Sequence, residues 1–110
     1  MVAVSITAEG ACGLTWPRWK RLVSEVESLG FAGLYCSDHI TGPFPPAHDS
    51  LEVILALGFL AQTTERVQFG PLVAPLSLRD PVMLARQGAA AIDVLRVGER
   101  PVAALIRLAP

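Results

Sequence analysis

Short apolar runs alternate with longer helical segments along the first 95 residues, and this alternation limits the fold more than any other feature. The runs at 2–6, 31–36 and 67–69 are brief, and a segment with helical spacing follows each of them. Such an order is typical of parallel sheets whose strands are joined by crossover helices. We therefore expect an α/β fold in which three units follow one another as β-α-β-α-β-α.

The first helical segment has the clearest boundaries. Thr15 is a typical N-cap, Pro17 lies in the first turn, where proline costs least, and Gly30 is a typical stop. The apolar residues recur in steps of three and four, which predicts one buried stripe: Trp16, Trp19, Leu22, Val23, Val26 and Leu29. The charged residues between them are expected to face water: Lys20, Arg21, Glu25 and Glu27.

Two further helices are predicted from their start signals. Asp49 and Glu52 have capping-box spacing, with Asp49 as the cap, ahead of an almost wholly apolar helix over 51–61. Asp80 followed by Pro81 predicts the start of a third helix that runs to about residue 95.

The segments after 67–69 are harder to assign. Gly70 and Pro71 are expected to close that strand, and the apolar stretch 72–78 is broken by Pro75. We therefore divide the chain into a domain over 1–95 and a divergent tail over 96–110.

Composition narrows the function classes. A formal charge of -1 and a pI near 6.1, without basic clusters, argue against nucleic acid or an anionic membrane as partner. No run reaches the length of a membrane span and the start lacks a secretory n-region, so we expect a cytoplasmic protein. Cys12 and Cys36 are expected to be free thiols.

Three ordered motifs resemble the luciferase-like monooxygenase superfamily. They are LGFAGLYCSDH over 29–39, AQTTERVQFG over 61–70 and RDPVMLARQ over 79–87. The resemblance implies the front portion of a TIM-like (β/α)8 barrel, whose active site lies at the carboxyl ends of parallel strands. It also implies an oxidoreductase that acts on a small-molecule substrate with a flavin or the deazaflavin coenzyme F420.

Asp38 and His39 follow the second expected strand. From spacing alone, Asp38 could simply cap a turn and His39 could be a polar loop residue. The resemblance implies catalytic roles, because the F420-dependent branch carries an Asp-His pair whose histidine lies against the cofactor. An imidazole can exchange protons near neutral pH. The Ser-Asp-His spelling favours F420, with FMN as the alternative. The same branch implies a cis peptide bond at the cofactor face, here between Leu72 and Val73.

Other polar residues carry weaker signals. His48 beside Asp49 resembles a metal pair, but its spacing fits no metal motif, so no metal site is predicted, and a metal hydrolase that uses His39 and His48 is a distant alternative. Arg79 could bind a phosphate or a carboxylate, although a role at the start of a helix is the simpler interpretation.

The resemblance stops after Asp93, where the family's Gly-Gly-Arg turn and fourth strand are unrecognisable. We expect a truncated or frameshifted barrel, since a whole one needs about 250 residues. Open sheet edges and apolar faces would then leave room for self-association. We expect the isolated chain to bind cofactor weakly or not at all and to be inactive, and the alternative function is a non-catalytic remnant with at most an association role.

Overall fold

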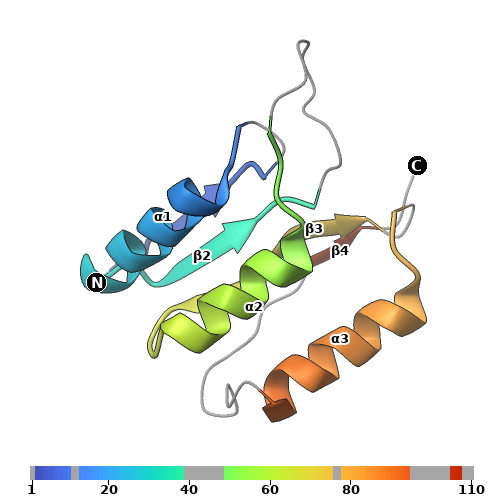
Figure 1. Ribbon diagram of the computed structural model, residues 1–110. Coiled ribbons are helices and arrows are strands. Elements are labelled where there is room, and N and C mark those ends of the chain that lie inside the picture. Colours follow the sequence, from blue (N-terminus) through green and yellow to red (C-terminus); the bar gives the residue numbers. More distant parts are fainter. Residues whose placement is uncertain (1, 11–12, 39–48, 76–77, 95–104, 108–110) are drawn as a thin grey trace.

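A computed structural model describes residues 2–10, 13–38, 49–75, 78–94 and 105–107. Strands and helices alternate in it, as the sequence predicts (Figure 1). The elements are β1 (Ser5–Ala8), α1 (Trp16–Ser28), β2 (Gly33–Cys36), α2 (Val53–Thr63), β3 (Gln68–Pro75), α3 (Pro81–Val94) and β4 (Leu105–Arg107).

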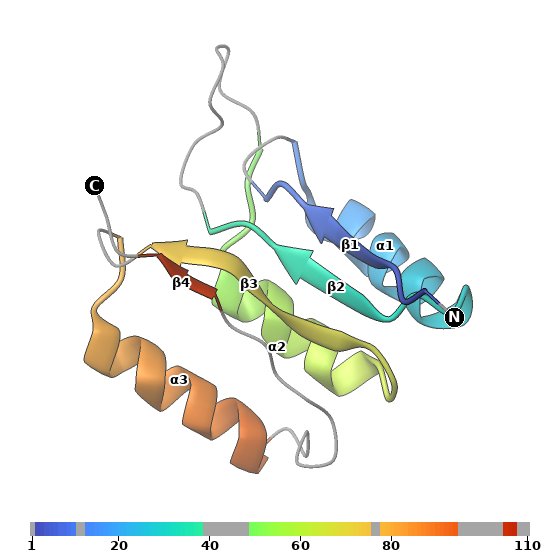
Figure 2. The same cartoon turned by 180° about the vertical axis from the view of Figure 1, so that it is seen from behind.

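The strands form one parallel sheet in the order β1-β2-β3-β4. Helices α1 and α2 cover one face of it, and α3 lies beside α2, while Figure 2 shows no described helix over the opposite face. Strands in sequential order with helices on one face are the arrangement of a (β/α)8 barrel, because a doubly wound sheet carries helices on both faces. The α/β fold is therefore confirmed as a partial barrel.

Helix α1 forms as its local signals predict. The Thr15 side chain accepts a hydrogen bond from the Arg18 N–H, and Pro17 lies in the first turn. The chain leaves the helix through Gly30, whose φ of +86° favours glycine. The buried stripe is narrower than predicted, because only Trp19, Val23 and Val26 are buried on α1.

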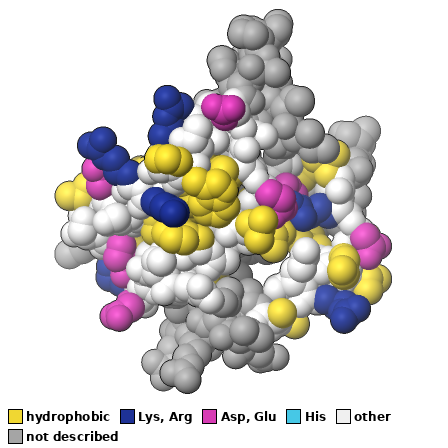
Figure 3. All heavy atoms as spheres, viewed as in Figure 1, with side chains coloured by type: hydrophobic (Ala, Val, Ile, Leu, Met, Phe, Trp, Pro, Cys, Tyr) yellow, Lys and Arg dark blue, Asp and Glu magenta, His cyan; other side chains and the backbone are white. Residues whose placement is uncertain are grey.

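The ends of that predicted stripe are exposed instead. Leu29 is 72% exposed, and Trp16 lies at the rim, where its ring meets Phe59 edge-on at 6.1 Å. The ammonium of Lys20 lies 5.7 Å from the centre of the Phe59 ring. Figure 3 shows hydrophobic side chains gathered over this face, with a basic side chain among them. Trp16 therefore covers the outside of the core rather than filling it.

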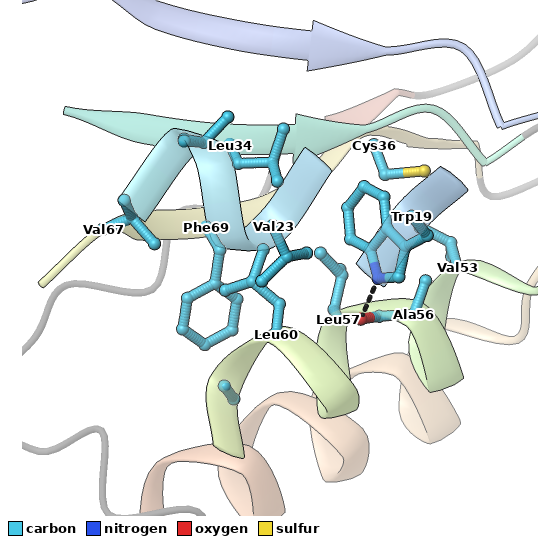
Figure 4. Packing of buried hydrophobic residues seen from close by; sticks show 12 residues of the cluster. Trp19, Val23, Leu34, Cys36, Val53, Ala56, Leu57, Leu60, Val67 and Phe69 are labelled. Atoms are coloured by element: carbon cyan, nitrogen blue, oxygen red, sulfur yellow. Dashed lines mark hydrogen bonds between the residues drawn. The ribbon is translucent and has the colours of Figure 1, made fainter. Parts of the chain in front are cut away.

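The core lies between the sheet and the first two helices (Figure 4). Trp19 is fully buried, and its indole N–H donates to the Ala56 carbonyl at 2.9 Å, which joins α1 to α2. Leu34 and Phe69 reach this core from neighbouring positions on β2 and β3. Burial of such side chains is the main stabilising contribution to the fold.

The strands β1, β2 and β3 differ from their predicted bounds, and β4 was not predicted. β2 begins at Gly33 rather than at residue 31. β1 begins at Ser5 rather than residue 2, because its pairing with β2 sets its limits. β3 continues through Pro71 to Pro75, because β2 and β4 flank it on both sides and this pairing overrides the local proline signal. Within the expected tail, Leu105–Arg107 pairs in parallel with β3 as a fourth strand that the sequence did not predict.

The helix starts agree with prediction at α3 and differ at α2. The Asp80 carboxylate accepts the Met83 N–H at 2.9 Å, so Asp80 caps α3. Helix α2 begins after Glu52 rather than after Asp49, and the Glu52 side chain accepts the Leu55 N–H at 2.9 Å. Asp49 lies outside the helix, where its carbonyl accepts the Gly13 N–H.

The face of the sheet that faces away from the helices is polar. Residues that alternate with the core positions lie there, and they are Ser5, Thr7, Gly33, Tyr35, Gln68 and Gly70. On β1, β2 and the first half of β3, these positions therefore hold small or polar residues rather than apolar ones. None of the described helices is long and apolar enough to cross a membrane.

Candidate active site at the carboxyl edge of the sheet

The described strands end at one common edge, because all of them run in the same direction (Figure 2). Asp38 lies just beyond the carboxyl end of β2, Glu52 immediately precedes α2, and Arg79 lies between β3 and α3. In barrel enzymes this edge holds the active site. The connections after β2 and β3 therefore bring these three charged residues to the position expected of a functional site.

Arg79 binds both carboxylates. Its Nε and Nη2 donate to the two oxygens of Asp38, the second at 2.9 Å, and Nη2 also donates to Glu52 Oε1. The Asp38 and Arg79 side chains are only 12% and 19% exposed, whereas Glu52 is 46% exposed. A bidentate arginine–carboxylate pair fixes the orientation of the carboxylate and also neutralises its charge. Asp38 is therefore held in place by a residue 41 positions away.

The electrostatics of the cluster follow from these contacts. Hydrogen bonds to Asp38 raise the pKa of Arg79, and those to Glu52 add to this despite the opposing effect of burial. Burial alone would raise the pKa of Glu52, but hydrogen bonds from Arg79 and from backbone N–H groups of Leu55 and Ile54 outweigh it and lower the pKa. The site therefore combines two carboxylates with one permanent cation.

Hydrogen bonds link the segments that follow β1 and β2 next to this cluster. Ser37 is buried, its Oγ accepts the Gly10 N–H at 2.9 Å, and its own N–H donates to the Ala8 carbonyl. A Cβ on residue 10 would lie 3.1 Å from the Ser37 carbonyl and 3.2 Å from Cys36 Sγ, so Gly10 permits this close approach. Ser37 thus fixes the backbone from which Asp38 extends.

Cys36 is a free, buried thiol, as expected. Burial raises its pKa to about 11, and the charges of Glu9, Asp38 and Glu52 contribute to the increase. A thiol with this pKa is protonated at neutral pH and is a poor nucleophile. Cys36 is therefore part of the packing beneath the site. Cys12 lies outside the described residues.

The Leu72–Val73 peptide bond is cis, as the resemblance implied. Both residues are half-buried in the carboxyl half of β3. Cys36 pairs with Pro71, and Val73 and Asp38 each follow that pair by two residues along their own strands. The cis bond and Asp38 therefore both follow the last β2–β3 pair, toward the carboxyl edge.

Of the remaining predicted site residues, the structure describes Asp38 but neither histidine. His39 and His48 lie outside the described residues, so the structure leaves their roles untested. Within the described part of the chain, no three His, Cys, Asp or Glu side chains are grouped so that they could hold a metal ion. Asp38 is where the sequence predicted it, after β2.

Sequence reasoning missed the partners of Asp38. Arg79 was interpreted chiefly as a residue at a helix start, and Glu52 as the second member of a capping box. One signal in the sequence was available. Glu52 and Arg79 each precede a helix, and the N-termini of these helices lie at the same edge as Asp38. The predicted topology would have placed the three residues at one edge of the sheet, although not their contact.

Comparison with known proteins agrees with this geometry. Residues 2–96 match the model of the luciferase-like monooxygenase family, which covers all three β/α units and the whole carboxyl-edge cluster. No curated protein matches the chain. Since the match spans most of the 110 residues, this chain belongs to the luciferase-like monooxygenases and is at family level an oxidoreductase.

Proposed function

We propose that the carboxyl edge of this sheet is part of the cofactor site of an oxidoreductase that uses coenzyme F420 on a small organic substrate. The observation that carries this proposal is the position of Asp38, fixed by Arg79 at the end of β2 within a luciferase-like fold. That edge is where barrels of this type carry their chemistry. When bound, F420 would supply hydride transfer, whereas a reduced flavin could also support oxygenation.

The described residues fit the ring of such a cofactor better than its phosphate. Leu72 and Val73 are half-buried apolar residues that follow the last β2–β3 pair, as Asp38 does, so they offer a surface for a planar ring. Arg79, the cation of the cluster, already binds two carboxylates of its own chain. Phosphate sites in these barrels usually lie at later strands. The proposed contribution of this part is therefore to hold the ring.

Asp38 and His39 have different parts in the proposal. Both Asp38 oxygens accept hydrogen bonds from Arg79, which suits a fixed acceptor rather than a proton donor. An imidazole can exchange a proton near neutral pH, so His39 is the residue proposed to do so beside the ring. We favour F420 over FMN as the cofactor because the sequence Ser37-Asp38-His39 resembles that of the F420-dependent branch.

Fluorescence titration of the full chain with F420 and with FMN tests the proposal. We expect weak but saturable binding that is tighter for F420, and a loss of about tenfold in affinity, or ~1.4 kcal/mol, in His39→Ala. His48→Ala is the matched control, and its affinity should stay within about twofold of the original chain. Tighter binding of FMN would contradict the F420 assignment. A folded chain that binds neither compound would contradict the cofactor site and favour a non-catalytic remnant.

A further inference from the structure

One guanidinium joins three separate segments at the carboxyl edge. Arg79 comes from the connection after β3, Asp38 follows β2, and Glu52 is the N-cap of α2. Among the described contacts, these are the side-chain hydrogen bonds that link the second and third β/α units at this edge. The position of Asp38 relative to β3 therefore depends on Arg79.

The geometry of the contact is specific to arginine. Nε and Nη2 donate in parallel to the two oxygens of Asp38, so the carboxylate plane follows the guanidinium plane. Nη2 also reaches Glu52. A lysine ammonium is a point charge without this fork, so it could neutralise the site without fixing the same orientation.

The burial of the three side chains shows which contact matters more. Asp38 and Arg79 are largely shielded from water, whereas Glu52 is nearly half exposed. Loss of Arg79 would leave two carboxylates close together without their cation, and one of them would be largely buried. Loss of the Glu52 charge would leave the Asp38–Arg79 pair intact. The two contacts can therefore be tested separately.

We propose that Arg79 is the positioning residue of this site. It fixes the Asp38 carboxylate as an oriented hydrogen-bond acceptor at the carboxyl edge of the sheet, where the cofactor ring is proposed to bind. This inference rests on the proposed function for the identity of the ligand, but the placement of Asp38 can be measured without any ligand. Arg79 acts through Asp38 and is not assigned a contact with the cofactor.

The first experiment compares Arg79→Lys and Arg79→Gln with the control Arg21→Lys by F420 fluorescence titration. We expect both Arg79 variants to lose about tenfold or more in affinity, because neither reproduces the fork. Arg21→Lys makes the same exchange at an exposed arginine of α1, whose described ion pair is with Glu25, so its affinity should change by no more than about twofold. Arg79→Lys that binds as tightly as the original chain would overturn the proposal. Circular dichroism of each variant confirms that it is folded.

A second measurement keeps the inference separate from the proposed function. The ¹³C resonance of the Asp38 carboxyl carbon, assigned through Asp38→Asn, reports its hydrogen bonding without cofactor. We expect this resonance to shift in Arg79→Lys and to move little in Glu52→Gln. An unchanged Asp38 resonance in Arg79→Lys would overturn the positioning role. If the original chain binds neither F420 nor FMN, the proposed function fails, and this resonance alone decides the role of Arg79.

Discussion

The two ends of the sheet both carry an arginine with carboxylates, but they use them differently. At the amino end, one Glu27 oxygen accepts the N–H groups of Glu65 and Arg66, both at 2.9 Å, and the other accepts the Val67 N–H at 3.1 Å. The Arg66 guanidinium donates to the carbonyls of Phe31, Val26 and Glu27. These partners are all backbone groups, so this cluster joins the end of α1 to the start of β3.

At the carboxyl end, the partners of the arginine are side chains. Arg79 binds Asp38 and Glu52, and each carboxylate oxygen that it contacts has a further lone pair. The backbone N–H and carbonyl groups at the amino end could bind a ligand only if a turn unfolded. The oriented side chains at the carboxyl end can accept a further hydrogen bond from a ligand without such a change. The same residue types therefore support the fold at one end and a binding site at the other, which matches the division of roles in barrels.

The largest effect on this comparison is expected from Glu27→Ala. It removes the carboxylate that accepts three backbone N–H groups. Because these hydrogen bonds are charge-assisted, we expect the free energy of unfolding to fall by about 2 kcal/mol. Urea denaturation measures this change. Glu25→Ala, whose described ion pair is the exposed one with Arg21, is the matched control and should cost less than about 0.5 kcal/mol. Equal losses in both variants would show that the amino-end cluster has no special role.

The amino end also shows why sequence alone gave only part of the structure. The limits of α1 were predicted because Thr15 and Gly30 are local signals that act within one turn. Glu27 was predicted to face water because it lies off the apolar stripe, and its real partners are 38 to 40 residues away. Helix periodicity contains no information about such distant partners.

The same limit applies to the candidate site. Asp38 could be placed at a strand end from the preceding apolar run, and the family motifs located the cis bond at Leu72–Val73. The contact with Arg79 could not be predicted from spacing, because it depends on how β2 and β3 pair in space. β4 was missed for a similar reason, since three residues become a strand only when β3 lies beside them.

Acid sensitivity should be unequal at the two ends. Burial opposes the shift, but the backbone N–H groups of residues 65–67 and the Arg66 charge hold the pKa of Glu27 below its usual 4.5. Arg79 and the α2 backbone lower the pKa of Glu52. A carboxyl whose pKa is lowered by folding stabilises the native state above its unfolded pKa, and this stabilisation is lost as the pH falls through the folded value.

The original chain should therefore lose stability from about pH 5 downward, and Glu27→Gln should flatten this decrease more than Glu52→Gln. Glu52 is the more exposed carboxyl of its cluster, so solvent screens its contribution. Urea midpoints at constant ionic strength across this pH range give the comparison. A steeper acid loss in Glu27→Gln than in the original chain would contradict the assignment of Glu27.

The smallest effect concerns the thiol beneath the carboxyl end. Cys36 is buried against Ser37, whose carbonyl lies 3.6 Å from Sγ, and its pKa is raised to about 11 by burial and by nearby carboxylates. In a Cys12→Ser chain, only Cys36 remains to react with a thiol reagent. At neutral pH its alkylation should be slow and should accelerate in urea in step with unfolding, because the reactive thiolate is scarce and shielded. Fast alkylation of the folded chain would show that the carboxyl edge opens without unfolding, and the fixed Asp38 acceptor would then lose its support from β2.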